Sequence, residues 1–189
     1  MQDFSLHILD LVENSINAKA KRIEIKIDED EGNDLLTIEI SDNGAGMSEE
    51  MVAKVLDPFV TTRTTRKVGL GLSLFSQAAQ NCNGEATIRS EPGKGTRLTG
   101  RFQLSHIDLK PWGSMVDTIL TLVIGNPEVD FLYQHRKGAF EYTLDSAVIK
   151  RELDGVSLSN PDAVSYTHLR AHETVTLIAY AVFCLKTGG

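Results

Sequence analysis

Apolar residues in the first 20 positions recur at the spacing of an α-helix and predict one over residues 4–19. They repeat every three or four residues: Leu6, Leu9, Val12 and Ile16. A polar set repeats in the same way along a second line of this helix: His7, Asp10, Asn14 and Asn17. Because residues three or four apart share one face of a helix, we expect a mostly buried helix with a narrow polar seam that lines a cavity.

Strict alternation of apolar and polar residues predicts two strands after this helix, over residues 22–27 and 35–40. The acidic stretch between them, residues 28–34, predicts a solvated turn with no further role. We therefore expect an antiparallel hairpin with one buried face.

The remaining elements follow from the same periodicities and from helix start and stop signals. Up to residue 104 they are a helix over 49–56 capped by Ser48, a loop over 60–67, a helix over 70–82, and a hairpin of 85–90 and 96–103. Beyond it they are helices over 113–124 and 145–153 and strands over 129–135 and 139–143. Interleaved helices and hairpins predict the α/β class, as a two-layer α/β sandwich over residues 1–104. Residues 105–163 are expected to form a small α+β C-terminal appendage that binds a partner or dimerises.

The composition is that of a soluble globular protein and narrows its partners. The 189 residues carry a net charge of −7, which argues against a nucleic-acid partner held through its phosphates. Cys82 and Cys184 lie far apart without metal or redox spacing, so we expect a reduced, cytoplasmic setting. The apolar stretch over residues 175–185 is shorter than the roughly 20 residues of a membrane span, and we expect no membrane association.

The end of the chain has an unusual sequence. Residues 164–174 resemble the translation of a transposon adapter used in sequencing libraries. We therefore expect the natural chain to end near Ala163 and residues 164–189 to be a non-native tail without a part in the fold. The tail holds three potential metal ligands: His168, His172 and Glu173. Their short cluster lacks further partners, so we expect no metal site there.

The polar seam of the first helix carries candidate chemistry. The amide oxygen of Asn14 is a hard, neutral ligand that suits Mg²⁺ bridging phosphate oxygens. Asp10, one turn earlier, could hold or deprotonate an attacking water, and Glu13 is a rival base that faces away from the line joining Asp10 to Asn14. These residues alone leave two alternatives open, a core amide for Asn14 and a salt bridge for either carboxylate.

Asp42 ends the second predicted strand and is followed by a Gly-x-Gly turn. Its carboxylate can accept a hydrogen bond from an exocyclic amino group, as adenine offers. Gly44 and Gly46 would let a flat ring approach the backbone. A plain Asx turn is the alternative, because Asp-Asn-Gly is itself a turn signal.

A second Gly-x-Gly, at Gly69 and Gly71, precedes a predicted helix. The unpaired N–H groups of a helix N-terminus form an anion site, and glycines leave it unobstructed. Arg63, Arg66 and Lys67 stand just upstream and could neutralise a triphosphate, or they form only a solvated basic loop. Flexible loops close over phosphates where water must be excluded, so this segment is a candidate lid.

Four motifs in this order resemble the ATP pocket of the Bergerat-type (GHKL) superfamily. They are residues 10–17, 42–47, 57–62 and 68–73, and the resemblance covers residues 4–104. The superfamily contains sensor histidine kinases, DNA gyrase, mismatch-repair ATPases, heat-shock chaperone ATPases and anti-sigma-factor serine kinases. The resemblance implies the Bergerat ATP-binding fold, with ATP and Mg²⁺ as cofactors.

The resemblance also implies a role for individual residues. Asn14 would hold Mg²⁺, Asp42 would bind the adenine amino group, and the segment from Phe59 to Lys67 would form a lid over ATP. The implied nucleotide-binding residues are Asn14, Asn17, Asp42, Gly44, Gly46, Met47, Phe59, Thr62, Arg63, Arg66, Lys67, Gly69, Leu70, Gly71 and Leu72. The implied catalytic candidates are Asp10 and Glu13.

The motifs point to two branches of the superfamily. Residues 57–62, 69–73 and 91–96 are similar to a histidine kinase catalytic domain, whereas the first helix is more similar to mismatch-repair ATPases. Kinases usually carry Lys where this chain has Asn17. A histidine kinase also needs an upstream phosphoacceptor histidine, but only three residues precede the first helix, and His7 lies within it. We therefore do not expect a self-contained histidine kinase.

The function expected from the sequence is an Mg²⁺-dependent ATP-binding protein with kinase or ATPase activity toward a separate partner protein or phosphoacceptor. An anti-sigma-factor-like serine kinase and a non-catalytic, ATP-responsive interaction module are the alternatives. A domain of a larger mechanical ATPase is a further one, and it predicts a homodimer that forms with ATP.

Overall fold

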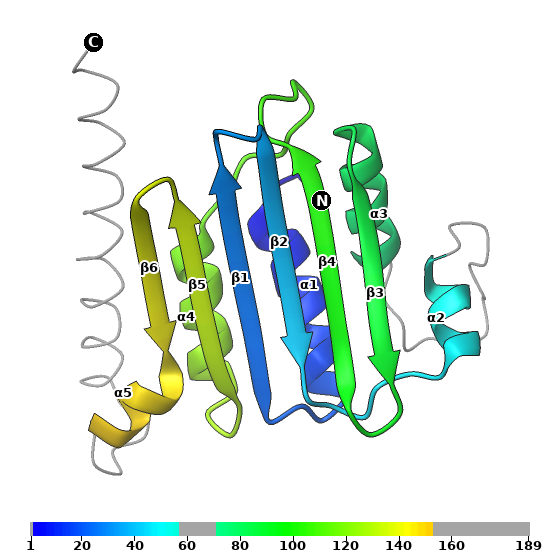
Figure 1. Ribbon diagram of the computed structural model, residues 1–189. Helices are drawn as coiled ribbons and strands as arrows, with labels where there is room; N and C mark the ends of the chain where they lie inside the picture. The colour runs from blue at the N-terminus through cyan, green and yellow to red at the C-terminus, as the bar shows by residue number, and fades with distance from the viewer. Residues whose placement is uncertain (1, 57–70, 153–189) are drawn as a thin grey trace.

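A six-stranded mixed sheet carries helices on one face, and Figure 1 shows α1, α3 and α4 behind the strands. The computed structural model describes residues 2–56 and 71–152. In chain order the elements are α1 (Phe4–Asn17), β1 (Arg22–Asp30), β2 (Leu35–Asp42), α2 (Glu49–Leu56), α3 (Gly71–Asn81), β3 (Glu85–Glu91), β4 (Gly95–Gln103), α4 (Met115–Gly125), β5 (Asp130–Lys137), β6 (Phe140–Asp145) and α5 (Ser146–Glu152). The strand order is β3-β4-β2-β1-β5-β6, with β1 and β5 parallel and the other neighbours antiparallel. The α/β class predicted from the sequence is confirmed.

The core forms where α1 packs against the central strands. Its buried apolar side chains are Ile23, Ile25 and Ile27 of β1, Leu36, Ile38 and Ile40 of β2, and Phe4, Ile8, Leu11 and Val12 of α1. The alternation in the sequence is therefore an alternation between the core face and the open face of the sheet. Burying one such side chain stabilises the fold by about 1.5–3 kcal/mol.

Aromatic packing holds α3 beside α1. The ring of Phe102, on β4, meets Phe4 of α1 and Phe75 of α3 edge-on, with ring centroids 5.1 and 5.4 Å apart. Gly100 leaves the space for Phe75, because a Cβ at this position would lie 2.4 Å from the ring. Edge-to-face pairs stabilise by about 0.5–1.5 kcal/mol beyond the area that they bury. The beginning of α3 is thereby brought against α1.

The helices lie close to their predicted bounds. The carboxylate of Asp3 accepts a hydrogen bond from the Leu6 N–H at 3.0 Å and caps α1, which ends at Asn17, two residues before the predicted end. The helix predicted over 49–56 is α2, and Ser48 accepts backbone hydrogen bonds at its start. Among the described residues, no helix has both the length and the apolarity to cross a membrane.

The prediction for the acidic residues 28–34 is wrong in one respect. β1 continues to Asp30 and buries Glu29 on the core face. Its carboxylate lies 2.8 Å from Nε2 of His135 and accepts a hydrogen bond from Lys137 at 2.9 Å, both on β5. The alternation that buries Ile23 to Ile27 extends to residue 29, and β5 supplies the polar partners that burial of a carboxylate requires.

The C-terminal strands belong to the same sheet as the motif-bearing segment. β5 pairs in parallel with β1 along its length, from Arg22 opposite Asp130 to Glu29 opposite Lys137. The boundary predicted at residue 104 therefore does not coincide with a break in the sheet. A parallel pair needs a crossover, and the segment containing α4 provides it.

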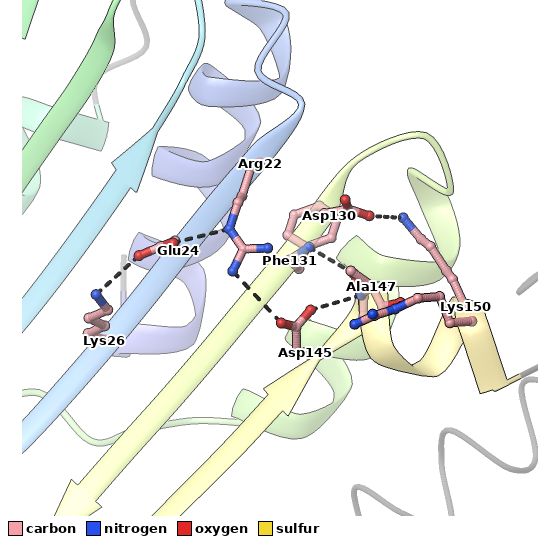
Figure 2. Close-up of polar contacts among 10 residues, drawn as sticks. Arg22, Glu24, Lys26, Asp130, Phe131, Asp145, Ala147 and Lys150 are labelled. Atoms are coloured by element: carbon pink, nitrogen blue, oxygen red, sulfur yellow. Dashed lines mark hydrogen bonds and ion pairs between the residues drawn. The ribbon is translucent and has the colours of Figure 1, made fainter.

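Polar contacts join the end of β6 and the start of α5 to the beginning of β1 (Figure 2). The guanidinium of Arg22 lies 3.1 Å from Glu24 and 3.8 Å from Asp145. Asp145 also accepts a hydrogen bond from the Ala147 N–H at 2.9 Å, at the start of α5. The same arginine begins β1, so residues 145–147 are tied to the end of the sheet where Asp42 pairs with Ile23.

The ammonium of Lys150 holds α5 against β5. It donates to the carbonyl oxygen of Val129 at 2.7 Å and to the carboxylate of Asp130 at 2.8 Å. The hydroxyl of Ser146 accepts a hydrogen bond from the Phe131 N–H at 2.8 Å and is fully buried. Polar groups at this corner are thus paired across elements rather than left to solvent.

Candidate functional site

Asp42, the last residue of β2, has a carboxylate held from two sides. The hydroxyl of Ser15, on α1, donates to Oδ2 at 2.8 Å. The N–H of Gly44 donates to Oδ1 at 2.8 Å, which is the Asx-turn bond that the alternative interpretation predicted. Each oxygen keeps a further lone pair, because a carboxylate offers about four acceptor positions. The turn and an acceptor site therefore coexist.

The turn after Asp42 is clamped against two other segments. The Ala45 N–H donates to the Ala18 carbonyl at 2.9 Å, and the Ala45 carbonyl accepts from the Gly93 N–H at 2.7 Å. Gly46 has φ +67°, and a Cβ there would lie 2.0 Å from the Glu91 carbonyl oxygen. Only glycine fits this position, because it combines the left-handed region with backbone contact.

Three side chains support this turn although no role was predicted for them from the sequence. Asn43 accepts hydrogen bonds through Oδ1 from the N–H groups of Lys21 and Arg22, at 2.8 and 2.9 Å. The hydroxyl of Ser90, on β3, accepts from the Met47 N–H at 2.8 Å. The third is Ser15. Asp-Asn-Gly signals a turn, but nothing local to these residues indicates which distant N–H groups or hydroxyls they meet.

Asp10 and Gly71 lie in direct contact. A Cβ at Gly71, the first residue of α3, would stand 1.6 Å from Oδ2 of Asp10. That oxygen is buried and has no hydrogen-bond partner among the described residues. Glu13 is exposed and Leu72 is buried in the core. Of the two candidate bases, Asp10 is thus the one that the fold brings to the second glycine motif.

The two asparagines of the seam differ in exposure. Asn14 is half-buried and Asn17 is exposed, and neither side-chain amide has a hydrogen-bond partner among the residues that the structure describes. The backbone carbonyl of Asn14 accepts from the Ala18 N–H at 3.0 Å and ends the helix. Asn14 thus lies half-buried in the last turn of α1.

His7, at the other end of the seam, does not line a cavity. It is 2% exposed and packs between Phe4 and Phe75, with ring centroids 6.4 and 6.0 Å away. Neither ring nitrogen has a partner within the described residues. Burial lowers the pKa of His7 from 6.5 to about 4, so the imidazole is neutral at physiological pH. The polar side chains of this seam are therefore fully buried at His7 and only half-buried at Asp10 and Asn14.

A depression of about 770 Å³ lies beside the Asp42 turn. Its lining includes Asp42, Asn43, Glu49, Val52, Arg89, Ser90 and Arg97. Asp10, Asn14 and Gly71 do not line it. The residues predicted to form the lid and first phosphate contacts lie outside the described residues: Phe59, Thr62, Arg63, Arg66, Lys67, Gly69 and Leu70. The depression therefore adjoins Asp42 but not the contact of Asp10 with Gly71.

Comparison with known proteins decides the family. Residues 3–106 match the family described as histidine kinase-, DNA gyrase B- and HSP90-like ATPase. The chain belongs to this ATPase family. The predicted superfamily resemblance is thereby confirmed, and the matched segment of this ATPase chain carries Asp10, Asn14, Asp42 and Gly71.

Sensor proteins are among the relatives that this chain is similar to. The sensor protein kinase FleS of Pseudomonas aeruginosa is 39% identical over 92 residues, which are 49% of this chain and 23% of FleS. The sensor protein DegM of a Bacillus species is 32% identical over 91 residues, 48% of this chain and 24% of DegM. The chain thus spans less than a quarter of either relative.

A solved structure gives a comparison of the fold alone. The N-terminal domain of a DNA repair protein superposes with a TM-score of 0.53 at 16% identity, covering 77% of this chain and 53% of that chain. Its coverage of this chain exceeds the segment matched by the two sensor proteins, in agreement with a sheet that continues beyond residue 106.

Proposed function

We propose that the chain binds ATP with Mg²⁺ and transfers or hydrolyses the γ-phosphate in the service of a separate protein partner in the cytoplasm. The observation that carries the proposal is the contact of Asp10 with Gly71. It puts a carboxylate beside the N-terminus of α3, where a phosphate would bind. Membership of an ATPase family supports the nucleotide, and the name of FleS, a sensor protein kinase, supports phosphate transfer to protein.

In this proposal the nucleotide base is bound at the end of β2. The carboxylate of Asp42 accepts a hydrogen bond from the exocyclic amino group of adenine. The flat ring would lie against the turn that contains Gly44 and Gly46, and Met47 follows in the same turn. The contacts that already clamp this turn support it, since a preformed site loses less conformational entropy on binding.

The phosphates are bound at the start of α3 and by the segment before it. N–H groups from Gly71 and Leu72 attract phosphate oxygens, and the missing Cβ at Gly71 leaves room for the carboxylate of Asp10 beside them. Asn14 offers an amide oxygen to Mg²⁺, and its lack of a partner among the described residues supports this role. When bound, Mg²⁺ would neutralise charge on the phosphate oxygens.

Asp10 acts as the general base. It takes a proton from the attacking hydroxyl or water as the new oxygen–phosphorus bond forms and the bond from the γ-phosphorus to the bridging oxygen breaks, leaving ADP. Its Oδ2 is buried against Gly71, which limits competing hydrogen bonds from water. Glu13 is exposed on another face of α1.

The test follows radiolabelled γ-phosphate with the full chain, Mg²⁺ and ATP, and measures ATP affinity by calorimetry. We expect Asp10→Asn to lower turnover at least about 100-fold, the usual contribution of a general base, while leaving ATP affinity nearly unchanged. If Glu13→Gln loses turnover and Asp10→Asn keeps it, the assignment of the base is wrong. If the wild type binds ATP but neither hydrolyses nor transfers phosphate, the enzyme proposal fails and a binding module remains. Light scattering with and without ATP shows whether a homodimer forms.

A further inference from the structure

Ser15 and Asp42 are joined by a hydrogen bond between two elements that carry different motifs. The hydroxyl of Ser15 donates to Oδ2 of Asp42 at 2.8 Å, although the residues are 27 positions apart. Ser15 is buried, with 6% of its surface exposed, and lies next to Asn14 on α1. A buried hydroxyl is expected to have a partner, and here the partner is the carboxylate at the end of β2.

This bond completes the support of the Asp42 carboxylate. Gly44 holds Oδ1 from the turn, and Ser15 holds Oδ2 from the helix. Two donors on the two oxygens oppose rotation of the carboxylate plane. Both donors use the oxygens as acceptors, and the carboxylate has further acceptor positions for a donor from a third group.

We propose that Ser15 is a positioning residue that determines the base specificity of the site, an inference that rests on the proposed function. By holding Asp42 as an oriented acceptor, Ser15 favours a base that presents an amino group, as adenine does. Guanine presents a carbonyl oxygen at the equivalent position, and two acceptors would face one another. A site built to receive one hydrogen-bonding group rejects a ligand with the wrong one, because the buried partner is left unpaired.

The chain contains a matched control on the same helix. Ser5 is also a buried serine of α1, 4% exposed, and its hydroxyl donates to the carboxylate of Asp3 at 2.7 Å. This bond lies at the first turn of α1, whereas Ser15 lies in the last. Ser5→Ala therefore removes the same kind of hydrogen bond from the same helix without changing Asp42.

The experiment measures dissociation constants of ATP and GTP by calorimetry for the full chain with Mg²⁺. For Ser15→Ala we expect ATP affinity to fall about tenfold, as loss of a hydrogen bond to a charged group implies, with GTP affinity changed less than about twofold. The ratio of the two affinities should fall accordingly. Ser5→Ala should leave the ratio unchanged. In an Asp42→Asn background, Ser15→Ala should have a smaller effect on ATP, because the two residues act through one contact.

Each outcome decides the inference. If Ser15→Ala stays folded and weakens ATP and GTP equally, or weakens neither, Ser15 does not set base specificity, and the proposed function stands. If the wild type binds no ATP, the proposed function and this inference both fail. If Ser15→Ala does not fold, as judged by urea unfolding, Ser15→Cys takes its place. A thiol is a weaker donor of similar size, so the expected change in the ratio is smaller, and an unchanged ratio overturns the inference.

Discussion

The carboxylate of Asp10 lies against the α-carbon of Gly71, so close that a methyl group on Gly71 would stand 1.6 Å from Oδ2. The contact joins the middle of α1 to the first residue of α3, and Phe75, one turn further along α3, packs against Phe102 of β4. A residue with any side chain at position 71 would displace the carboxylate. The carboxylate of Asp10, the candidate base, can therefore keep its position only while residue 71 is glycine.

Gly71→Ala should separate the position of Asp10 from the stability of the fold. The clashing oxygen is at the end of a side chain that can rotate, so we expect a loss of about 1–3 kcal/mol in the free energy of unfolding. Turnover should fall much further, because Asp10 leaves its position. Urea unfolding and labelled-phosphate assays measure the two effects.

Two further variants control for this result. At Gly125, the end of α4, a Cβ would meet nothing within 4 Å, so Gly125→Ala should leave stability unchanged or raise it by up to about 1 kcal/mol. The double variant Asp10→Ala with Gly71→Ala should regain stability, since the nearest remaining Asp10 atom is Cβ at 3.2 Å. A double variant no more stable than Gly71→Ala would contradict the clash.

Gly46→Ala and Gly93→Ala form a matched pair that isolates backbone contact from backbone conformation. Both glycines have positive φ, +67° and +77°, but a Cβ at Gly46 would lie 2.0 Å from the Glu91 carbonyl oxygen and one at Gly93 meets nothing within 4 Å. We expect Gly93→Ala to cost about 1–2 kcal/mol and Gly46→Ala about 3 kcal/mol or more, with loss of ATP binding. Equal costs, measured by urea unfolding, would mean that the turn moves freely.

The burial of His7 leads us to expect that the free energy of unfolding depends on pH. Its pKa is about 4 in the folded chain, because it is buried, and 6.5 when unfolded. Below pH 6.5 the unfolded chain gains a proton that the folded chain does not, so stability falls as the pH drops toward 4. The expected loss is about 2–3 kcal/mol between pH 7 and 4.5.

His7→Leu should remove this part of the pH dependence. Carboxylates also change stability in this range, so the comparison of wild type and variant by urea unfolding at pH 7 and 4.5 isolates the histidine. At pH 7 the variant should be as stable as the wild type or more so, because two unpartnered ring nitrogens are removed from the core. The same loss on acidification in both proteins would show that His7 is not buried as a neutral group.

Glu29→Gln should destabilise the fold because it breaks a buried charge pair. Burial opposes the charge of Glu29, but hydrogen bonds from His135 and Lys137 outweigh it and lower the pKa below 4.5. The contribution of Glu29 is therefore present above pH 4.5 and is lost as the pH falls through the lowered pKa. We expect the variant to lose about 3 kcal/mol at pH 7.

The control for Glu29 is an exposed ion pair. Glu85 lies 3.6 Å from Arg101, and both side chains are more than half exposed. Glu85→Gln should therefore change the free energy of unfolding by less than about 1 kcal/mol. If both variants lower the free energy of unfolding equally, the contacts of Glu29 with β5 contribute no more than a surface salt bridge.

Most of the secondary structure could be predicted because its signals are local. β1 and β2 alternate between buried and half-buried residues as the sequence does, and α1 shows the predicted helical repeat. The parallel pairing of β5 with β1 could not be predicted, because each strand pattern is compatible with several partners. Glu29 was missed for the same reason, since its partners lie more than 100 residues away.

The sequence by itself determined the α/β class, the order of the motifs and the ATPase family, because periodicity and motif spacing are properties of neighbouring residues. Only the tertiary structure decided that Ser15 meets Asp42, that Asp10 rather than Glu13 meets Gly71, and that His7 is closed off. These contacts depend on the orientation of α1 about its own axis and on how it packs against the sheet and α3. That orientation results from all the core side chains acting together, and no short segment of the chain encodes it.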